Sequence, residues 1–337
     1  MEVIVIKKMC SAVFVVVVLQ CVLSLPSRAQ LPSSCTPTQS WYFPDPLPFG
    51  WYVFLAYPGT YAYLIAANSC PPDPPCHCNT AAQPIALATG ETFIDQVDIK
   101  IPGLGGGLSL TRTWDSTWSP SLSAFQTGIF GPNWRSTYEE RIVFATDNYI
   151  KYIRSDTTFW SFGVGGSVTS WAVIGPANIG ATLNTDTSTN SYFTLTSLSG
   201  EQRRFDKTTG NLIAIIDRNG NTTTVAYDSS GRLSTVTDAA SRTLTFTYGG
   251  SFTNLATSVS SSAGISLSYS YDTQGRLIQV TKPDLTTVTF TYNSLSQITA
   301  VTDSNGKVLE SHTYDGSNRG LTASRANGVE AVTITYP

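Results

Sequence analysis

The segment Tyr227-Asp228-Ser229-Ser230-Gly231-Arg232-Leu233 returns as Tyr271-Asp272-Thr273-Gln274-Gly275-Arg276-Leu277, and a weaker copy begins at Phe205. The aromatic residue that opens each copy recurs at intervals of 21 to 23 residues. A fixed period of this size marks a repeat architecture. The series predicts about six 22-residue units over residues 201–337, opening at Phe205, Tyr227, Tyr248, Tyr271, Tyr292 and Tyr314 and closing at Tyr336.

Two signals predict that each unit holds two strands and two turns. Before Tyr248, Leu244 and Phe246 alternate with threonines, and this pattern of aromatic and β-branched residues predicts a half-buried strand. After the tyrosine, Asp-x-x-Gly favours a tight turn, because Asp accepts hydrogen bonds from the backbone and Gly tolerates a positive φ. The repeat-defining residues are Tyr227, Asp228, Gly231, Arg232, Tyr271, Asp272, Gly275 and Arg276.

These strands predict an all-β fold. A single hairpin is only marginally stable, so the units are expected to pair edge to edge. The expected product is a long continuous antiparallel sheet made of tandem hairpins. The chain after residue 29 shows no convincing 3.6-residue hydrophobic period that would indicate a helix.

The motif Tyr-Asp-x-x-Gly-Arg-Leu resembles the YD repeat of Rhs and teneurin-type proteins. The match is close in the units from Tyr227 and Tyr271 and partial in the others. Asn293 replaces the aspartate of one unit, and the unit from Tyr248 has lost the turn motif. The resemblance implies that the hairpins form part of an Rhs-type β shell.

A second block, over residues 80–200, is similar to the domain that precedes YD repeats in bacterial Rhs-type and polymorphic-toxin proteins. It departs from that pattern at Gln83, where the family has Asn. Read physically, alternation around Leu108 and Leu110 predicts another strand. The motifs of this block are Pro84-Ile85 with Thr89-Gly90, then Thr111-Arg112-Thr113-Trp114-Asp115-Ser116, then Phe130-Gly131-Pro132-Asn133-Trp134.

Residues 1–29 are expected to be a signal peptide. Lys7 and Lys8 precede an apolar run, and Ser27-Arg28-Ala29 offers small residues for cleavage. A membrane anchor is the alternative, but the run is at the short limit for a span. We therefore expect a secreted or cell-surface protein with no membrane segment beyond the signal. A segment rich in Pro, Cys and aromatic residues follows over 30–79.

Four cysteines remain after the predicted signal: Cys35, Cys70, Cys76 and Cys78. An even number in an exported chain favours disulfides, and three pairings are possible. The cluster around His77 also contains enough thiolates and imidazole for a zinc site. The spacing Cys-x5-Cys-His-Cys is not a standard ligand pattern, so disulfides are the favoured interpretation and no metal or other cofactor is expected.

Composition and motifs argue against several functions. A net charge of −3 and a pI near 5.4 disfavour nucleic acid as a partner, because phosphate binding needs a basic face. The glycine-rich run from Gly103 to Gly107 opens a predicted strand, which indicates a connection and not a phosphate loop. His312 occupies the position of Phe246 in its unit, which indicates packing. No catalytic set stands out, so the chain is not expected to be an enzyme.

Three functions fit these observations. The resemblance implies the first, a non-enzymatic scaffold that forms the N-terminal part of a shell and encloses or delivers a C-terminal toxin absent from this chain. The family's shell-closing motifs are missing, and about twelve predicted strands are too few to close a cavity, so a truncated piece is expected in that case. The second is a surface adhesion protein that binds glycans. The third is a fragment without an independent role.

Overall fold

The structure is a computed structural model that describes residues 2–8, 14–20, 51–55, 80–81, 85–86, 89–144, 149–167, 170–176, 179–189, 191–325 and 328–336. Within these ranges the chain is almost entirely β, with two short 3-10 segments, η1 (Leu104–Gly106) and η2 (Pro120–Phe125), and no α-helix. The predicted all-β fold is confirmed.

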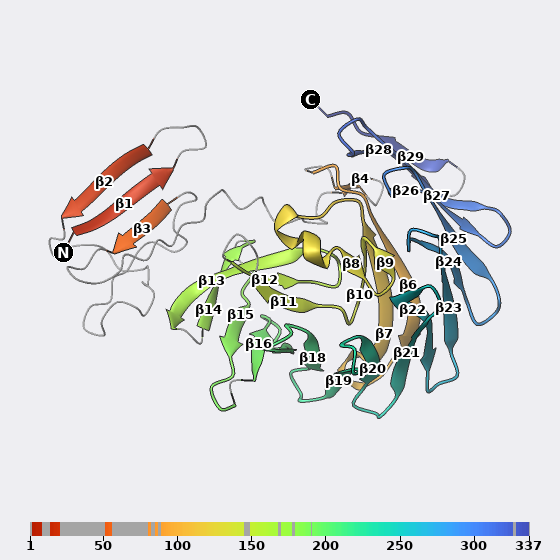
Figure 1. Cartoon of the computed structure of the whole chain (residues 1–337), viewed down its shortest axis with the longest axis horizontal. Coiled ribbons are helices and arrows are strands. Elements are labelled where there is room, and N and C mark those ends of the chain that lie inside the picture. Colours follow the sequence, from red (N-terminus) through yellow and green to blue (C-terminus); the bar gives the residue numbers. More distant parts are fainter. Residues whose placement is uncertain are drawn as a thin grey trace.

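One antiparallel sheet of 19 strands dominates the molecule, and each strand pairs with the next one in sequence. Figure 1 shows these strands following one another around a curve. They are β11 (Arg141–Phe144), β12 (Ile150–Ile153), β13 (Phe159–Ser167), β14 (Ser170–Gly175), β15 (Thr182–Thr185), β16 (Tyr192–Thr196), β17 (Gln202–Asp206), β18 (Leu212–Ile216), β19 (Thr222–Tyr227), β20 (Leu233–Thr237), β21 (Thr243–Gly249), β22 (Phe252–Ser261), β23 (Ser266–Tyr271), β24 (Leu277–Thr281), β25 (Thr287–Tyr292), β26 (Ile298–Asp303), β27 (Val308–Tyr314), β28 (Gly320–Arg325) and β29 (Val329–Thr333).

A second sheet lies along the inner side of this curve (Figure 1). It has the order β10-β7-β6 and comes from the block before the repeats. Short two-stranded pairings accompany it. The strands are β4 (Thr80–Ala81), β5 (Ile85–Ala86), β6 (Phe93–Ile101), β7 (Leu108–Asp115), β8 (Thr127–Gly128), β9 (Gly131–Pro132) and β10 (Trp134–Ser136). We call residues 89–140 the leader and residues 201–336 the array.

Bulges explain how the sheet of the array curves. The pairing shifts register immediately before Tyr227, Tyr248, Tyr271, Tyr292 and Tyr314, at the same point of each of these units. A bulge bends its strand and increases the local twist. Repetition of the same bulge at the same point in each unit therefore adds curvature in one direction.

The sheet also turns back on itself at its first strand. The Ile142 amide donates to the Gly210 carbonyl at 2.8 Å, and the Leu212 amide donates to the Glu140 carbonyl at 3.3 Å. The start of β11 therefore lies against the turn between β17 and β18. Strands β11 to β16 come before the repeats but belong to the same sheet, and the boundary expected at residue 200 stays a prediction.

One hydrophobic core joins leader and array. Leu108, Leu110 and Trp114 of the leader are fully buried in the same cluster as Leu244 and Phe246 of the array. The threonines that alternate with the last two, such as Thr245, point outward. Burial of each large apolar side chain contributes about 1.5–3 kcal/mol, so the inner face of the sheet depends on the leader to cover it.

A third sheet forms near the N-terminus from β1 (Glu2–Lys8), β2 (Phe14–Gln20) and β3 (Trp51–Leu55), in the order β2-β1-β3. Two of its strands fall within the predicted signal peptide. Cleavage after Ala29 would remove β1, the strand that pairs with β3, and also β2. The signal peptide stays a prediction, and so does the segment over 30–79, of which only β3 is described.

Candidate functional site

The repeat motif forms a closed turn in each unit. In the unit from Tyr227, the Asp228 carboxylate accepts hydrogen bonds from the amides of Ser230 at 2.9 Å and Arg232 at 3.0 Å. The Gly231 amide donates to the Asp228 carbonyl, and Gly231 has a φ of +74°. The side-chain bond from Arg232, together with these amides, lowers the pKa of Asp228. The unit with Asp272, Gly275 and Arg276 repeats the arrangement.

The arginine of the motif links one unit to the next. Arg232 Nε donates to Asp228 Oδ2 at 2.7 Å, and the guanidinium carbon lies 4.5 Å from the ring centroid of Tyr248, the tyrosine of the following unit. Its Nη1 donates to the Thr253 carbonyl of β22. The same stacking recurs for Arg276 on Tyr292 at 5.0 Å and for Arg319 on Tyr336 at 4.0 Å. Such cation–π contacts add about 0.5–1 kcal/mol at exposed sites.

Each tyrosine also bonds to the unit before it. The Tyr248 hydroxyl donates to the Leu233 carbonyl at 2.7 Å, fifteen residues earlier. We call the full set the tyrosine ladder. Burial raises the pKa of these hydroxyls, so they stay protonated donors at neutral pH. The other members are Tyr227 to Leu212 at 2.8 Å, Tyr271 to Ala256 at 2.6 Å, Tyr292 to Leu277 at 2.8 Å, Tyr314 to Ile298 at 2.8 Å and Tyr336 to Gly320 at 2.6 Å.

A buried arginine holds the leader to the array. Arg112 of β7 is 1% exposed, and its Nε and Nη2 donate to the Asp98 carboxylate at 2.5 and 2.8 Å. The Tyr269 hydroxyl of the array donates to the same carboxylate at 2.7 Å. We call Arg112, Asp98 and Tyr269 the arginine centre. Both charges are buried, so each depends on the other and on the surrounding hydrogen bonds.

Aromatic rings from both parts surround the Arg112 guanidinium. The leader provides Trp134 at 4.9 Å and Phe130 at 5.6 Å, and the array provides Tyr269 at 5.5 Å and Phe290 at 5.9 Å. The leader rings also contact the array rings directly, with 4.7 Å between the centroids of Phe130 and Tyr269 and 5.1 Å between those of Trp134 and Phe290. Two of the three leader motifs, those of Arg112 and of Phe130 and Trp134, therefore meet at this one centre.

The unit from Tyr248, which lacks the turn motif, lies where the leader touches the array. The Ala256 amide of β22 donates to the Ile129 carbonyl of the leader at 2.8 Å. Close by, Gly131 has a φ of +103°, and a Cβ there would lie 2.5 Å from the Gly275 carbonyl oxygen. Contact with the leader thus gives a structural reason for the irregular unit and for a glycine in the leader motif.

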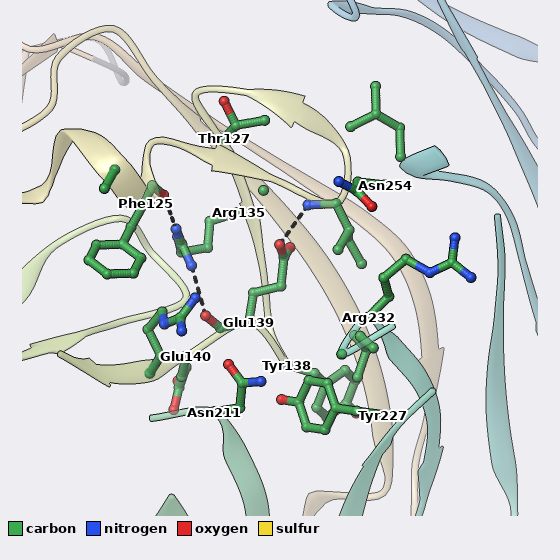
Figure 2. A pocket seen from close by; sticks show the side chains of 17 residues that line it. Phe125, Thr127, Arg135, Tyr138, Glu139, Glu140, Asn211, Tyr227, Arg232 and Asn254 are labelled. Atoms are coloured by element: carbon green, nitrogen blue, oxygen red, sulfur yellow. Dashed lines mark hydrogen bonds between the residues drawn. The ribbon is translucent and has the colours of Figure 1, made fainter. Parts of the chain in front are cut away.

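A pocket of about 330 Å³ lies between the leader and the array, and we call it the seam pocket. Figure 2 shows Arg135 between the carbonyls of Phe125 and Glu139, and the Glu139 carboxylate reaching toward the Ile129 amide. Burial raises the pKa of Glu139. Turns of the array complete the lining, which comprises Ala124, Phe125, Thr127, Gly128, Ile129, Arg135, Tyr138, Glu139, Glu140, Arg141, Asn211, Tyr227, Gly231, Arg232, Leu233, Asn254 and Leu255.

Two polar groups of this pocket have no hydrogen-bond partner among the described residues. Nε of Arg135 and Nε of Arg141 are both unpaired. The side chains of Asn211 and Asn254 line the same pocket. The pocket therefore offers donors and acceptors to a small polar molecule.

The other predicted residues are placed as follows. Cys35, Cys70, Cys76 and Cys78 lie outside the described residues, so the disulfides stay a prediction. His312 is buried, with Nε2 at 3.6 Å from Glu310. The glycine run from Gly103 connects β6 to β7.

Two further features are absent from the described ranges. No group of three or more metal-ligating side chains gathers anywhere among the described residues. Nor does that part of the chain contain a helix long and apolar enough to cross a bilayer.

Family models match both parts of the chain. The RHS Repeat model matches residues 206–243, 227–266, 253–287 and 271–308. Domain of unknown function (DUF6531) matches residues 82–162. The chain is an Rhs/YD-repeat protein. The resemblance of the repeat motif to YD repeats is thereby confirmed, and the second match overlaps the block that holds the leader motifs.

Two curated relatives are nucleases of Bacillus subtilis. The tRNA nuclease WapA of strain 168 and the tRNA(Glu)-specific nuclease WapA of subspecies natto are each 29% identical to this Rhs/YD-repeat protein over 146 residues. The match covers 43% of this chain and 6% of each relative. The chain thus spans a small fraction of their length.

Solved structures of toxin complexes are also similar. A crystal structure of TcdB2-TccC3 is 14% identical, with a TM-score of 0.29, and the match covers 69% of this chain and 15% of that one. The Tc holotoxin pore of Photorhabdus luminescens is 13% identical, with a TM-score of 0.26, and the match covers 72% and 14%. At these TM-scores the fold of the chain rests on its own strand pairing.

Sequence reasoning missed the partners of the site residues. The sequence places Arg112 in the alternating strand of Leu108 and Leu110 but predicts no partner for its charge. It does not single out Asp98 or Tyr269. A charged residue on the apolar face of a strand was the available signal, since such a residue needs a buried partner. The ladder acceptors were beyond prediction, because any residue supplies a backbone carbonyl.

Replacement of Arg112→Met should destabilise the fold by about 3–5 kcal/mol, because Asp98 would be left as an unpaired buried charge. The double change Arg112→Met with Asp98→Leu should recover much of this loss. Urea denaturation measures both. Arg154→Met is the matched control, since its ion pair with Asp156 is about one-third exposed and surface pairs contribute about 0–1 kcal/mol. An Arg112→Met protein as stable as the control would contradict a structural role for the centre.

Tyr248→Phe should cost about 1–2 kcal/mol, because the ring keeps its stacking on Arg232 while the Leu233 carbonyl loses its donor. Thr245→Val, on the outward face of the same strand, should stay within about 0.5 kcal/mol. Denaturant midpoints of the two variants give the comparison. Equal stability would show that the hydroxyl bond adds nothing to the coupling of units.

Proposed function

We propose that the chain is an exported, non-enzymatic scaffold and forms part of an Rhs-type shell that encloses or delivers a C-terminal toxin region. The observation that supports this proposal is the coupling between units. Each unit adds the same bulge, the same hydroxyl bond and, in the closest copies, the same arginine stack. A wall built in this way extends by repetition, as an enclosing shell requires.

The arrangement of charge also favours a structural role. Arg112 is paired with Asp98, and Glu140 accepts hydrogen bonds from Tyr152 at 2.7 Å and from Arg203 at 2.6 Å. These buried ionisable groups are held in internal bonds. The curated relatives are named as nucleases, and we assign such an activity to a region outside this chain.

Expression of the natural gene with its downstream sequence tests this function. We expect an exported protein that begins at Gln30, since small residues end the apolar run there. We also expect an open reading frame that continues past Pro337 into a protease-protected region, and no free thiol at the four cysteines. N-terminal sequencing, limited proteolysis with mass spectrometry and iodoacetamide labelling are the measurements.

Each part of the proposal has its own contrary outcome. A stop codon directly after Pro337 would count against toxin carriage by this gene product. A product that begins at Met1 would contradict export by cleavage. Four reactive thiols, or stoichiometric zinc, would contradict the disulfides.

The seam pocket favours a second candidate function, the binding of a glycan at the cell surface. Sugars both donate and accept hydrogen bonds and pack against aromatic rings. The pocket offers Glu139, Arg141, two asparagine amides and the ring of Tyr227. Its volume lies at the lower end for small-molecule sites, which suits a mono- or disaccharide.

A glycan array followed by calorimetry on residues 30–337 tests this alternative. Saturable binding should weaken at least about tenfold in Asn211→Ala with Asn254→Ala, since two hydrogen-bonding groups are lost. Asn305→Ala, on a turn away from the pocket, is the control and should bind as the wild type does. Absence of binding to every glycan and cell-wall fraction would remove this function.

A further inference from the structure

Two arginine side chains line the seam pocket and bond only to neutral groups. Arg135 is 3% exposed, and Arg141 is half-buried. Arg135 Nη1 donates to the Glu139 carbonyl at 2.8 Å, and its Nη2 donates to the Phe125 carbonyl (Figure 2). Arg141 Nη2 donates to the Thr209 carbonyl at 2.9 Å. All three acceptors are backbone oxygens, so these bonds fix the positions of the guanidiniums without balancing their charge.

Aromatic rings hold both guanidiniums in place. The guanidinium carbon of Arg135 lies 5.1 Å from the ring centroid of Trp118, and that of Arg141 lies 4.6 Å from the ring centroid of Phe125. A guanidinium that packs on a ring can still bond through the N–H groups at its planar edge. Nε of each arginine is buried and has no hydrogen-bond partner among the described residues. The pocket thus contains donors that its own side chains leave unused.

Two of the charged groups that line the pocket are already paired. Arg232 Nε donates to Asp228 Oδ2 at 2.7 Å. Arg203 Nε donates to Glu140 Oε2 at 2.6 Å. Each pair is neutral overall, so neither adds a net charge to the pocket.

The other ionisable groups of the lining leave one positive charge in excess. Burial raises the pKa of the Tyr138 and Tyr227 hydroxyls, which are therefore uncharged at neutral pH. Burial lowers the pKa of Arg135 to about 10, with Glu139 opposing this change and Arg141 adding to it, so Arg135 is still charged. Arg141 is also within the electrostatic reach of Glu139. One carboxylate therefore faces two guanidiniums.

The size of this excess indicates the class of ligand. A monoanion would neutralise the pocket, whereas a dianion would leave a negative charge in a partly buried site, which is costly. A carboxylate is planar and matches the fork of N–H groups on a guanidinium. A volume of about 330 Å³ leaves room beside the carboxylate for a small body such as one sugar ring.

We propose that the seam pocket binds the carboxylate of a small organic acid, with the guanidinium groups of Arg135 and Arg141 as its ligands. The carboxylate supplies the missing negative charge and accepts hydrogen bonds from the unused donors. Asn211 and Asn254 line the same pocket and can bond to the rest of the ligand. The inference rests on the pocket proposed above as a glycan site, but it requires a carboxylate and not a sugar. An acidic sugar and a short free acid are the two sources of this group.

Calorimetry on the whole chain, at neutral pH and low ionic strength, tests the inference with galacturonate, galactose and propionate. Galacturonate carries a carboxylate where galactose carries a hydroxymethyl group. We expect galacturonate to bind at least about tenfold more tightly than galactose, because hydrogen bonds between charged groups are the stronger ones. Binding of propionate as well would identify free acids as ligands, and its absence would restrict the pocket to acidic sugars. Either result for propionate, together with bound galacturonate, supports carboxylate recognition.

Variants separate recognition from a purely structural role. Arg141→Met should weaken the binding of galacturonate at least about tenfold, since a charged donor is lost. Glu139→Gln should strengthen it about threefold or more, because the one carboxylate that faces both guanidiniums loses its charge. Arg154→Met is the matched control and should bind as the wild type does. Arg154 also packs on an aromatic ring, that of Trp160 at 5.2 Å, but lies outside the pocket.

Several results would overturn the inference. Equal affinity for galactose and galacturonate would contradict carboxylate recognition while leaving the proposed glycan site intact. Binding of propionate without any sugar would instead contradict the glycan function alone. Failure of both galacturonate and propionate to bind, or equal binding by Arg141→Met and the wild type, would reject the proposal. If Arg141→Met does not fold, the wild-type comparison of galacturonate with galactose decides.

Discussion

The guanidinium of Arg112 is buried between two parts of the chain that are far apart in sequence. Taking a charge out of water is costly, so Arg112 depends on Asp98 for its counter-charge. Asp98 in turn receives the hydroxyl of Tyr269 from the array. Together with the surrounding rings, these bonds are satisfied only when leader and array are assembled. The centre therefore favours one placement of the leader over other apolar packings of the same strands.

From this centre outward, the array continues by rules that act between neighbours. The bulge before each tyrosine bends the sheet, the hydroxyl bonds the previous unit, and the arginine of the close copies stacks on the next tyrosine. Substitution within a unit is tolerated where the bonds survive. Asn293 and Gln297 replace the usual Asp and Arg, yet the Asn293 side chain still accepts from the backbone at 2.9 Å and Gln297 reaches the next turn.

The irregular unit from Tyr248 bears on whether the chain is a decayed fragment. Loss of the turn motif alone is consistent with decay. In the fold, the same unit contains the longest strand of the array, β22. The Ala256 amide of this strand donates a hydrogen bond to the Ile129 carbonyl of the leader. The unit that departs from the motif is thus the one that contacts the leader through β22, which is a structural reason for the departure.

The sequence by itself determined the local features of this protein: the 22-residue period, the alternating strands, the Asp-x-x-Gly turns and the all-β class. These follow from interactions between residues close in the chain, which leave a pattern in the residue types. The tertiary structure alone decided that the leader covers the inner face of the array and that Arg112 meets Asp98 and Tyr269. Those contacts join parts of the chain that are far apart in sequence and that only the curved sheet brings together. The curvature comes from bulges and backbone hydrogen bonds, which do not require particular side chains and so leave no clear pattern in the sequence.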